Sequence, residues 1–145
     1  MAKEPLFRFS PSIALALLIS LGGCSSTPVL TGQAEESKDR KVTEHSNISE
    51  RHSLQTIVIH DRLFIPGPIR PQIFVNGKSI GTVNQGEKLT FYVGAGVLRL
   101  GWSALTEGNY REQEFIVSPE THNVFHLTSP AGDVLRFIRE NEQGR

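Results

Sequence analysis

The sequence is poor in cysteine, since its 145 residues include only one, Cys24. A single cysteine cannot form a disulfide within the chain, and it cannot build a zinc site from cysteine ligands alone. The length is enough for one domain. A small domain without disulfides has to be stabilised by its own hydrophobic core.

An excess of one charge is also missing, because 15 basic and 15 acidic residues give a formal net charge of zero. No basic surface for nucleic acid and no acidic tail is indicated, so we expect no nucleic-acid partner. The chain also lacks a Gly-x-Ser-x-Gly motif, a phosphate-binding glycine loop and a His-Glu-x-x-His motif. These absences predict a protein that is not an enzyme and that uses no cofactor or metal.

The apolar run at residues 13–21 is too short for a transmembrane helix, which takes about 20 apolar residues. Lys3 and Arg8 precede this run, and two glycines follow it. A charged start, a short apolar core and a small-residue exit are typical of a secretory signal peptide. We therefore predict a signal peptide over residues 1–23.

The residues Leu21-Gly22-Gly23-Cys24 resemble the lipobox of bacterial lipoproteins, in which leucine and two small residues precede a cysteine. The resemblance implies that a lipid is attached to the thiol of Cys24 and that the chain is cut before this residue. The membrane would then be a partner through the lipid, and no free thiol would remain as a nucleophile. An ordinary signal peptide with an unmodified cysteine is the alternative.

Ser25 follows the cysteine of the lipobox. In Gram-negative lipoproteins a residue other than aspartate at this position implies export to the outer membrane. We therefore expect a location in the cell envelope, on the periplasmic side of the outer membrane, with a palmitate-type lipid anchor on Cys24.

Residues 24–52 are predicted to form the lipidated N-terminus and a flexible linker. Their apolar residues are scattered and follow neither a helical nor a strand period. Such a segment buries too little to offset its chain entropy, and as a coil it would reach about 30 Å. That reach would hold a domain off the membrane. A helix around residues 34–43 is the alternative.

From residue 53 on, short β-branched stretches alternate with turn signals. We predict strands at residues 54–60, 72–75, 78–83, 88–93, 97–102, 110–117, 123–128 and 134–138. Three prolines predict a rigid loop at residues 62–71. The spacing indicates an all-β fold, a small antiparallel β-sandwich of seven or eight strands over residues 53–140. A polar tail, residues 141–145, is expected to fray.

The dipeptide Asn76-Gly77 is the clearest turn signal, because a type I′ turn needs positive φ at both central residues. The stretch from Phe74 to Gly81, with the later turn Gly94-Ala95-Gly96, resembles the PEGA-like β-sandwich modules of bacterial surface lipoproteins. The resemblance covers residues 72–102 and departs at Ala95, where the family has proline. It implies a sandwich fold and no catalytic residue.

The sequence also contains candidate metal-binding and acid–base residues. The five histidines are His45, His52, His60, His122 and His126. His122 and His126 have the spacing of a metal clamp on a helix, but on a strand they would lie about 13 Å apart. Solvated or packed histidines are therefore the preferred interpretation. Glu112 and Glu114 share a strand face, which is more typical of a solvated surface than of a glycosidase pair.

Two groups of apolar residues have two interpretations each. Trp102 either forms an aromatic binding surface with Tyr92 and Tyr110 or continues the core face of Leu98 and Leu100, and we favour the core. Leu63, Phe64 and Ile65 lie in the predicted loop, where they either fold back over the sheet or contact a partner.

The sequence favours a lipid-anchored envelope lipoprotein whose β-sandwich is a non-enzymatic binding or assembly module, with envelope proteins as partners. An accessory subunit of a secretion, pilus or conjugation apparatus is the alternative. A cell-wall-acting enzyme is the third hypothesis.

Overall fold

A computed structural model of the chain describes residues 26–40, 54–63, 69–104, 109–130 and 134–142. Within these ranges there are nine strands and no α-helix. The strands are β1 (Glu35–Glu36), β2 (Leu54–His60), β3 (Pro71–Val75), β4 (Lys78–Thr82), β5 (Glu87–Val93), β6 (Gly96–Ala104), β7 (Arg111–Val117), β8 (Val124–Thr128) and β9 (Arg136–Arg139). A short 3-10 helix, η4 (Glu140–Glu142), follows the last strand.

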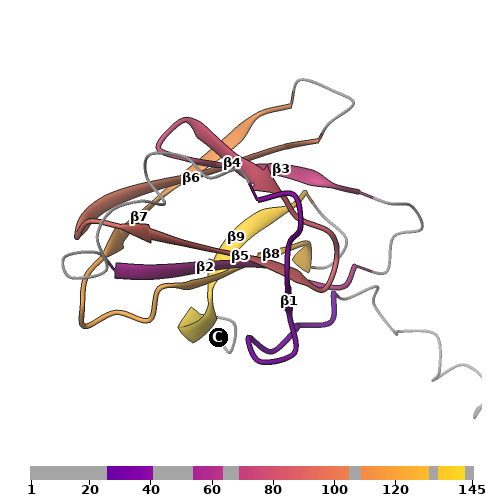
Figure 1. Ribbon diagram of the computed structural model, residues 1–145, viewed down its shortest axis with the longest axis horizontal. Coiled ribbons are helices and arrows are strands. Elements are labelled where there is room, and N and C mark those ends of the chain that lie inside the picture. Colours follow the sequence, from indigo (N-terminus) through magenta and orange to yellow (C-terminus); the bar gives the residue numbers. More distant parts are fainter. Residues whose placement is uncertain (1–25, 41–53, 64–68, 105–108, 131–133, 143–145) are drawn as a thin grey trace, which may run out of the picture.

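The strands form two sheets that stack as layers (Figure 1). A five-stranded sheet has the order β1-β5-β2-β8-β9, and a four-stranded sheet has the order β4-β3-β6-β7. The all-β sandwich that the sequence predicts is confirmed. The described ranges hold one or two more strands than expected, and two of the seven strand pairings, β1 with β5 and β2 with β8, are parallel rather than antiparallel.

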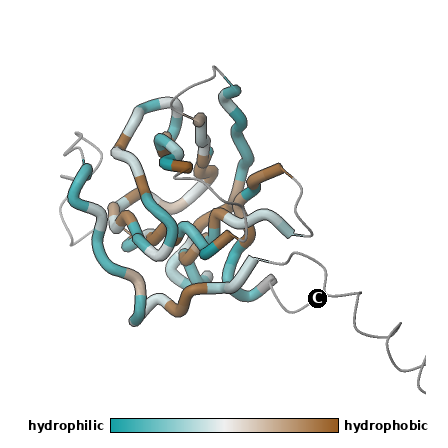
Figure 2. The backbone as a smooth tube through the Cα atoms, turned by 90° about the vertical axis from the view of Figure 1, so that its right-hand side faces the viewer, coloured by the Kyte–Doolittle hydropathy of each residue, from teal (hydrophilic) through white to brown (hydrophobic). Residues whose placement is uncertain are grey.

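The hydrophobic core lies between the two sheets. Side chains alternate across a strand, so every second residue of β5 and β6 points into this space. Leu98 and Leu100 are almost completely buried, and Trp102 is 7% exposed, which confirms the core interpretation of Trp102. Figure 2 shows hydrophobic and hydrophilic segments following one another along the backbone.

The predicted Asn76-Gly77 hairpin joins β3 to β4, and Val75 pairs with Lys78 across it. The φ angles of Asn76 and Gly77 are 49° and 78°. Both residues have the positive φ that a type I′ turn requires, so the predicted turn is confirmed.

Residues 26–40, which we call the N-terminal strap, lie on the sandwich. Val29 and Ala34 are buried at 5% and 7% exposure, over Ile59 and Val124 on the outer face of the five-stranded sheet. The strap then pairs β1 with β5 and continues to β4 of the other sheet, where Arg40 forms a bridge with Gly81. In Figure 1 the strap crosses from one layer to the other.

The flexible linker predicted for residues 24–52 is wrong over residues 26–40, which form the strap. The alternative of a helix around residues 34–43 is also wrong over its described part, residues 34–40. The prediction failed because the strap has no regular period. It covers the sheet with few apolar side chains and is held mainly by single hydrogen bonds. Residues 41–52, the rest of the predicted linker, and residues 143–145 of the predicted tail lie outside the described residues.

Candidate functional site

The start of the strap is the region that connects the fold to the predicted lipidation site. Cys24 lies outside the described residues, and the description begins two residues later at Ser26. The hydroxyl oxygens of Ser26 and Thr128 of β8 are 2.5 Å apart. The backbone of Thr27 exchanges two hydrogen bonds with Arg62, at 2.8 and 3.2 Å. The first described residues, Ser26 and Thr27, are therefore already attached to the sandwich.

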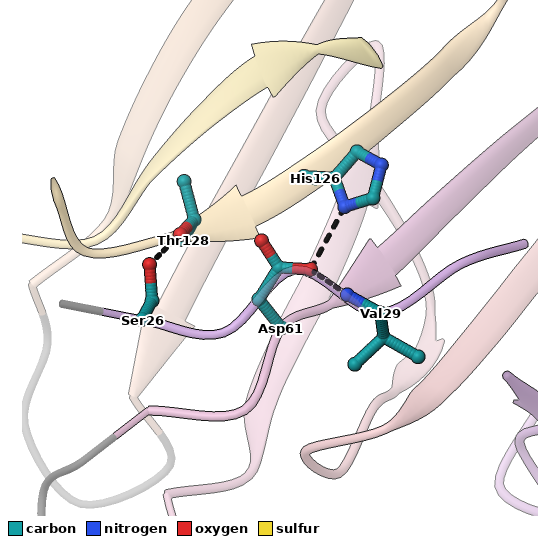
Figure 3. A network of polar contacts seen from close by, with 5 residues as sticks. All are labelled: Ser26, Val29, Asp61, His126 and Thr128. Atoms are coloured by element: carbon teal, nitrogen blue, oxygen red, sulfur yellow. Dashed lines mark hydrogen bonds and ion pairs between the residues drawn. The ribbon is translucent and has the colours of Figure 1, made fainter. Parts of the chain in front are cut away.

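A buried carboxylate holds the next part of the strap (Figure 3). Asp61 directly follows β2 and is completely buried. Its Oδ1 atom accepts a hydrogen bond of 3.0 Å from the backbone N–H of Val29. The same oxygen lies 2.8 Å from Nδ1 of His126, which is 2% exposed. Asp61 thus joins the strap, the end of β2 and the middle of β8.

A buried carboxylate needs partners, because burying an unpaired charge is very costly. The second carboxylate oxygen of Asp61 and Nε2 of His126 are buried without a hydrogen-bond partner among the described residues. A carboxylate–histidine pair also orients the base in a catalytic triad, but that arrangement needs a nucleophile on the other ring nitrogen. No described nucleophile occupies this position. The geometry instead fits a structural pair that fastens the strap.

Sequence reasoning missed Asp61 and His126 as partners. The sequences of β2 and β8 contain one signal that the outer face near these two residues is covered. Ile57, Val58 and Ile59 are consecutive apolar residues, and all five residues of β8 are buried. Such runs indicate strands that are covered on both faces. They predict a covering layer on the outer face, although not which segment supplies it.

His60 lies on the opposite face of β2 and points between the sheets. It is completely buried, and its Nδ1 atom lies 3.3 Å from the carbonyl oxygen of Val83, to which it donates a hydrogen bond. Burial lowers the pKa of His60, while the Val83 hydrogen bond and the charges of Asp61 and Glu87 oppose this shift. His60 is therefore a packed neutral histidine, in line with the preferred sequence interpretation.

The remaining candidates do not converge on one site. His122 is exposed and bonds Glu140 at 2.9 Å, whereas His126 is buried under the strap. Among the described residues no three His, Cys, Asp or Glu side chains are grouped to hold a metal. His45 and His52 lie outside the described residues.

Glu112 and Glu114 lie exposed on β7, as expected for a solvated face. Glu112 lies 3.8 Å from Arg99 and accepts a hydrogen bond from the hydroxyl of Tyr110. Partial burial, together with this bond, raises the pKa of Tyr110 to about 12. Tyr110 also packs edge-on against Phe74, with ring centroids 5.1 Å apart.

The structure excludes one of the proposed partner contacts. Leu63 is 8% exposed and belongs to the core between the sheets, so it folds back as the first of the two interpretations states. Its apolar side chain packs in the core, and its backbone N–H donates a hydrogen bond of 3.1 Å to Oε1 of Gln85, which holds the chain against the sandwich. Phe64 and Ile65 lie outside the described residues.

A surface hollow of about 580 Å³ opens at the end of the sandwich where the strap begins. Its lining combines apolar, polar and charged side chains: Trp102, Arg111, Glu112, Gln113, Pro130, Val134, Leu135 and Arg136. At the other end of β6 and β7, Val97 and Ile116 stand opposite each other with 65% and 71% exposure. The molecule therefore presents two different surfaces at its two ends.

Comparisons of the chain with models of known protein families, with curated proteins and with solved structures each find no match. The resemblances to bacterial lipoproteins and to PEGA-like modules therefore stay predictions. No helix in the described part of the chain has the length and apolar character needed to cross a membrane.

Proposed function

We propose that this protein is a lipid-anchored envelope lipoprotein whose β-sandwich is a non-enzymatic binding or assembly module. The observation that supports this proposal most is the position of the strap. Ser26, two residues after the lipobox cysteine, already contacts Thr128 of the sandwich. A lipid on Cys24 would therefore fasten one defined end of the sandwich to the membrane, without the long spacer that the sequence suggested.

The surface at the other end supports the binding role. Val97 and Ile116 are paired across β6 and β7 near Gly96, whereas the strap begins near the opposite ends of the strands. These two β-branched side chains are mostly exposed side by side and form an apolar patch, and contiguous apolar patches can mark contact surfaces. In an anchored molecule this pair would be directed away from the membrane, where an envelope protein can reach it.

The anchor is tested by mass spectrometry of the mature protein isolated from membranes. We expect an acylated N-terminus that begins at Cys24. Cys24→Ala removes the acceptor thiol and is expected to leave the precursor uncut. Ser25→Ala keeps the thiol and serves as the matched control. A mature chain that begins elsewhere with an unmodified thiol would contradict the proposal.

The expected outer-membrane location is tested by fractionation of a Gram-negative host. The wild-type protein should sediment with the outer membrane, and Ser25→Asp should move it to the inner membrane. Ser25→Asn has a similar size without the charge and should stay with the wild type. Recovery of the wild type from the inner membrane would overturn this part of the proposal.

The binding role is tested by a photo-crosslinking amino acid at position 116 of the lipidated protein in cells. Gln55, which is exposed at the same end of the other sheet, is the control position. We expect protein adducts from position 116 and few from position 55. A stoichiometric complex that survives gentle detergent would favour the accessory-subunit form of the proposal. Equal labelling from both positions would contradict a binding surface at Ile116.

A further inference from the structure

The strap fixes the place where the lipid would leave the fold. Ser26 touches Thr128, and Thr27 is paired with Arg62. Two residues of chain span at most about 7 Å, so Cys24 lies within that distance of Ser26. We call this part of the molecule, formed by Ser26, Arg62, Thr128 and the hollow beside them, the anchor end.

The anchor end carries exposed arginines. Arg62 is exposed next to Thr27, and Arg136 is exposed next to Thr128, its pairing partner in β9. Arg136 also lines the hollow, and Arg111 at the start of β7 lines its other side. These three side chains come from β7, β9 and the segment after β2. The fold therefore places Arg111 and Arg136 at the hollow and Arg62 beside Thr27, with its side chain near Gly86.

An apolar side chain stands among these arginines. Val134 lines the same hollow and is 54% exposed, which leaves a β-branched residue open to solvent. Pro130, Leu135 and Trp102 complete the apolar part of the lining. Exposed apolar residues beside arginines are the composition of surfaces that rest in a membrane interface.

The acidic groups of the anchor end are already partnered. Glu112 lines the hollow, but its carboxylate is engaged by Arg99 and by the hydroxyl of Tyr110. Asp61 is completely buried and paired with His126. Among the described residues that line the hollow, the cations Arg111 and Arg136 therefore outnumber the single carboxylate of Glu112. Arg62, whose side chain lies near Gly86, adds a third positive charge at this end of the sandwich.

We infer that the anchor end is a docking surface for anionic lipid headgroups of the membrane that holds the Cys24 lipid. This inference rests on the proposed lipidation of Cys24. Guanidinium groups pair well with headgroup phosphates, because their planar N–H donors match phosphate oxygens. Docking turns a freely pivoting domain into one with a fixed orientation. The Val97–Ile116 surface then points into the periplasm.

The test measures how close each end of the lipidated full chain lies to the bilayer. Cys24 is the only cysteine, and lipidation consumes its thiol, so an introduced cysteine is labelled at one position. A fluorophore is attached to Val134→Cys at the anchor end or to Val97→Cys at the opposite end. The proteins are reconstituted in phosphatidylcholine vesicles with or without phosphatidylglycerol, and spin-labelled lipid is the quencher.

We expect strong quenching of the label at position 134 in the phosphatidylglycerol vesicles and little at position 97. High salt should weaken the effect, because it shortens the Debye length from about 10 Å at 0.1 M to about 3 Å at 1 M. Each arginine near an anionic surface contributes about fivefold to binding, so Arg111→Gln with Arg136→Gln should lower the docked-to-undocked ratio roughly 25-fold. Lys38→Gln with Lys78→Gln removes the same charge from other exposed positions and should change little.

The outcomes separate this inference from the proposed function. If the protein lacks an acyl group and does not bind vesicles, the proposed function fails. If it is acylated and vesicle-bound but the labels at 134 and 97 are quenched equally, the docking surface is overturned and the lipoprotein remains. The same conclusion follows if the Arg111/Arg136 variant is quenched like the wild type. Circular dichroism of each variant confirms that it is folded.

Discussion

The cluster between the two sheets and the cluster beneath the N-terminal strap share strands β2 and β8 but differ in what covers them. Between the sheets, Val58 and Phe125 meet the apolar side chains of regular strands from the opposite layer. On the outer face, Ile59 and Val124 meet only Val29 and Ala34 of the strap. The cluster between the sheets is covered by apolar side chains. The cluster beneath the strap depends strongly on the hydrogen bonds that hold the strap in place.

The two clusters should respond differently to substitutions. Apolar contacts between sheets are many and non-directional, so one truncation weakens the whole fold. The strap is held by a few directed bonds, such as Val29 to Asp61 and Ser37 to the carbonyl oxygen of Thr82 at 2.7 Å. Loss of one such bond should release the strap locally while the sheets persist. This difference can be tested with substitutions aimed at one cluster at a time.

Leu100→Ala should have the largest effect. Leu100 is completely buried between the sheets, and truncation of such a residue costs about 2–5 kcal/mol through lost burial and a cavity. Urea denaturation of a soluble form, residues 25–145, measures the free energy of unfolding. Val97→Ala on the same strand is the control, and as an exposed position it should cost less than about 0.5 kcal/mol. Equal costs for the two variants would contradict the assigned register of β6.

Asp61→Ala should act on the strap. It leaves the N–H of Val29 and the ring of His126 without their buried acceptor, at about 1–3 kcal/mol for each such group. Hydrogen exchange should accelerate in residues 26–34, while the amides of β3 and β6 stay protected. Glu35→Ala removes an exposed carboxylate of the same strap and is the matched control. Unchanged exchange in the strap would show that Asp61 does not fasten it.

The sandwich could be predicted from the sequence because its strands alternate and its turns carry Gly, Pro and Asn at the required positions. The segment 54–60 coincides with β2, and the Asn76-Gly77 turn lies where the dipeptide indicates. The strap could not be predicted, because its two-residue strand β1 and its single side-chain bonds leave no period in the sequence. The parallel pairing of β2 with β8 joins strands that are far apart in the chain, and alternation within each strand does not specify that neighbour.

Gly77 and Gly81 both have positive φ, so Gly77→Ala and Gly81→Ala can be compared directly. Gly77 at 78° has nothing within 4 Å of an added Cβ, whereas at Gly81, with φ of 148°, this atom would lie 2.7 Å from the backbone oxygen of Asp39. Each substitution should cost about 1–3 kcal/mol through backbone strain. Only Gly81→Ala should also displace the strap, seen as faster hydrogen exchange in residues 37–40. Faster exchange there in Gly77→Ala as well would mean that the strap responds to the hairpin rather than to contact at Gly81.

Titration of His60 should have the smallest and most gradual effect on the free energy of unfolding. Its pH dependence tests the cluster between the sheets separately from the strap. Because burial lowers the pKa of His60 in the folded state below its ordinary value of 6.5, the unfolded chain binds the proton more readily. The contribution of neutral His60 to the free energy of unfolding is therefore complete above pH 6.5. It is lost as the pH falls below that value, by at most about 1.4 kcal/mol per pH unit for one proton.

His60→Asn keeps a side-chain N–H near the carbonyl oxygen of Val83 but does not titrate, so the stability of this variant should fall less between pH 7 and pH 5. Urea denaturation at each pH measures the slope, and His122→Asn, at an exposed histidine, is the control. If wild type and His60→Asn lose stability in parallel over this range, the acid sensitivity originates outside the cluster between the sheets, and the buried position of His60 is not its cause.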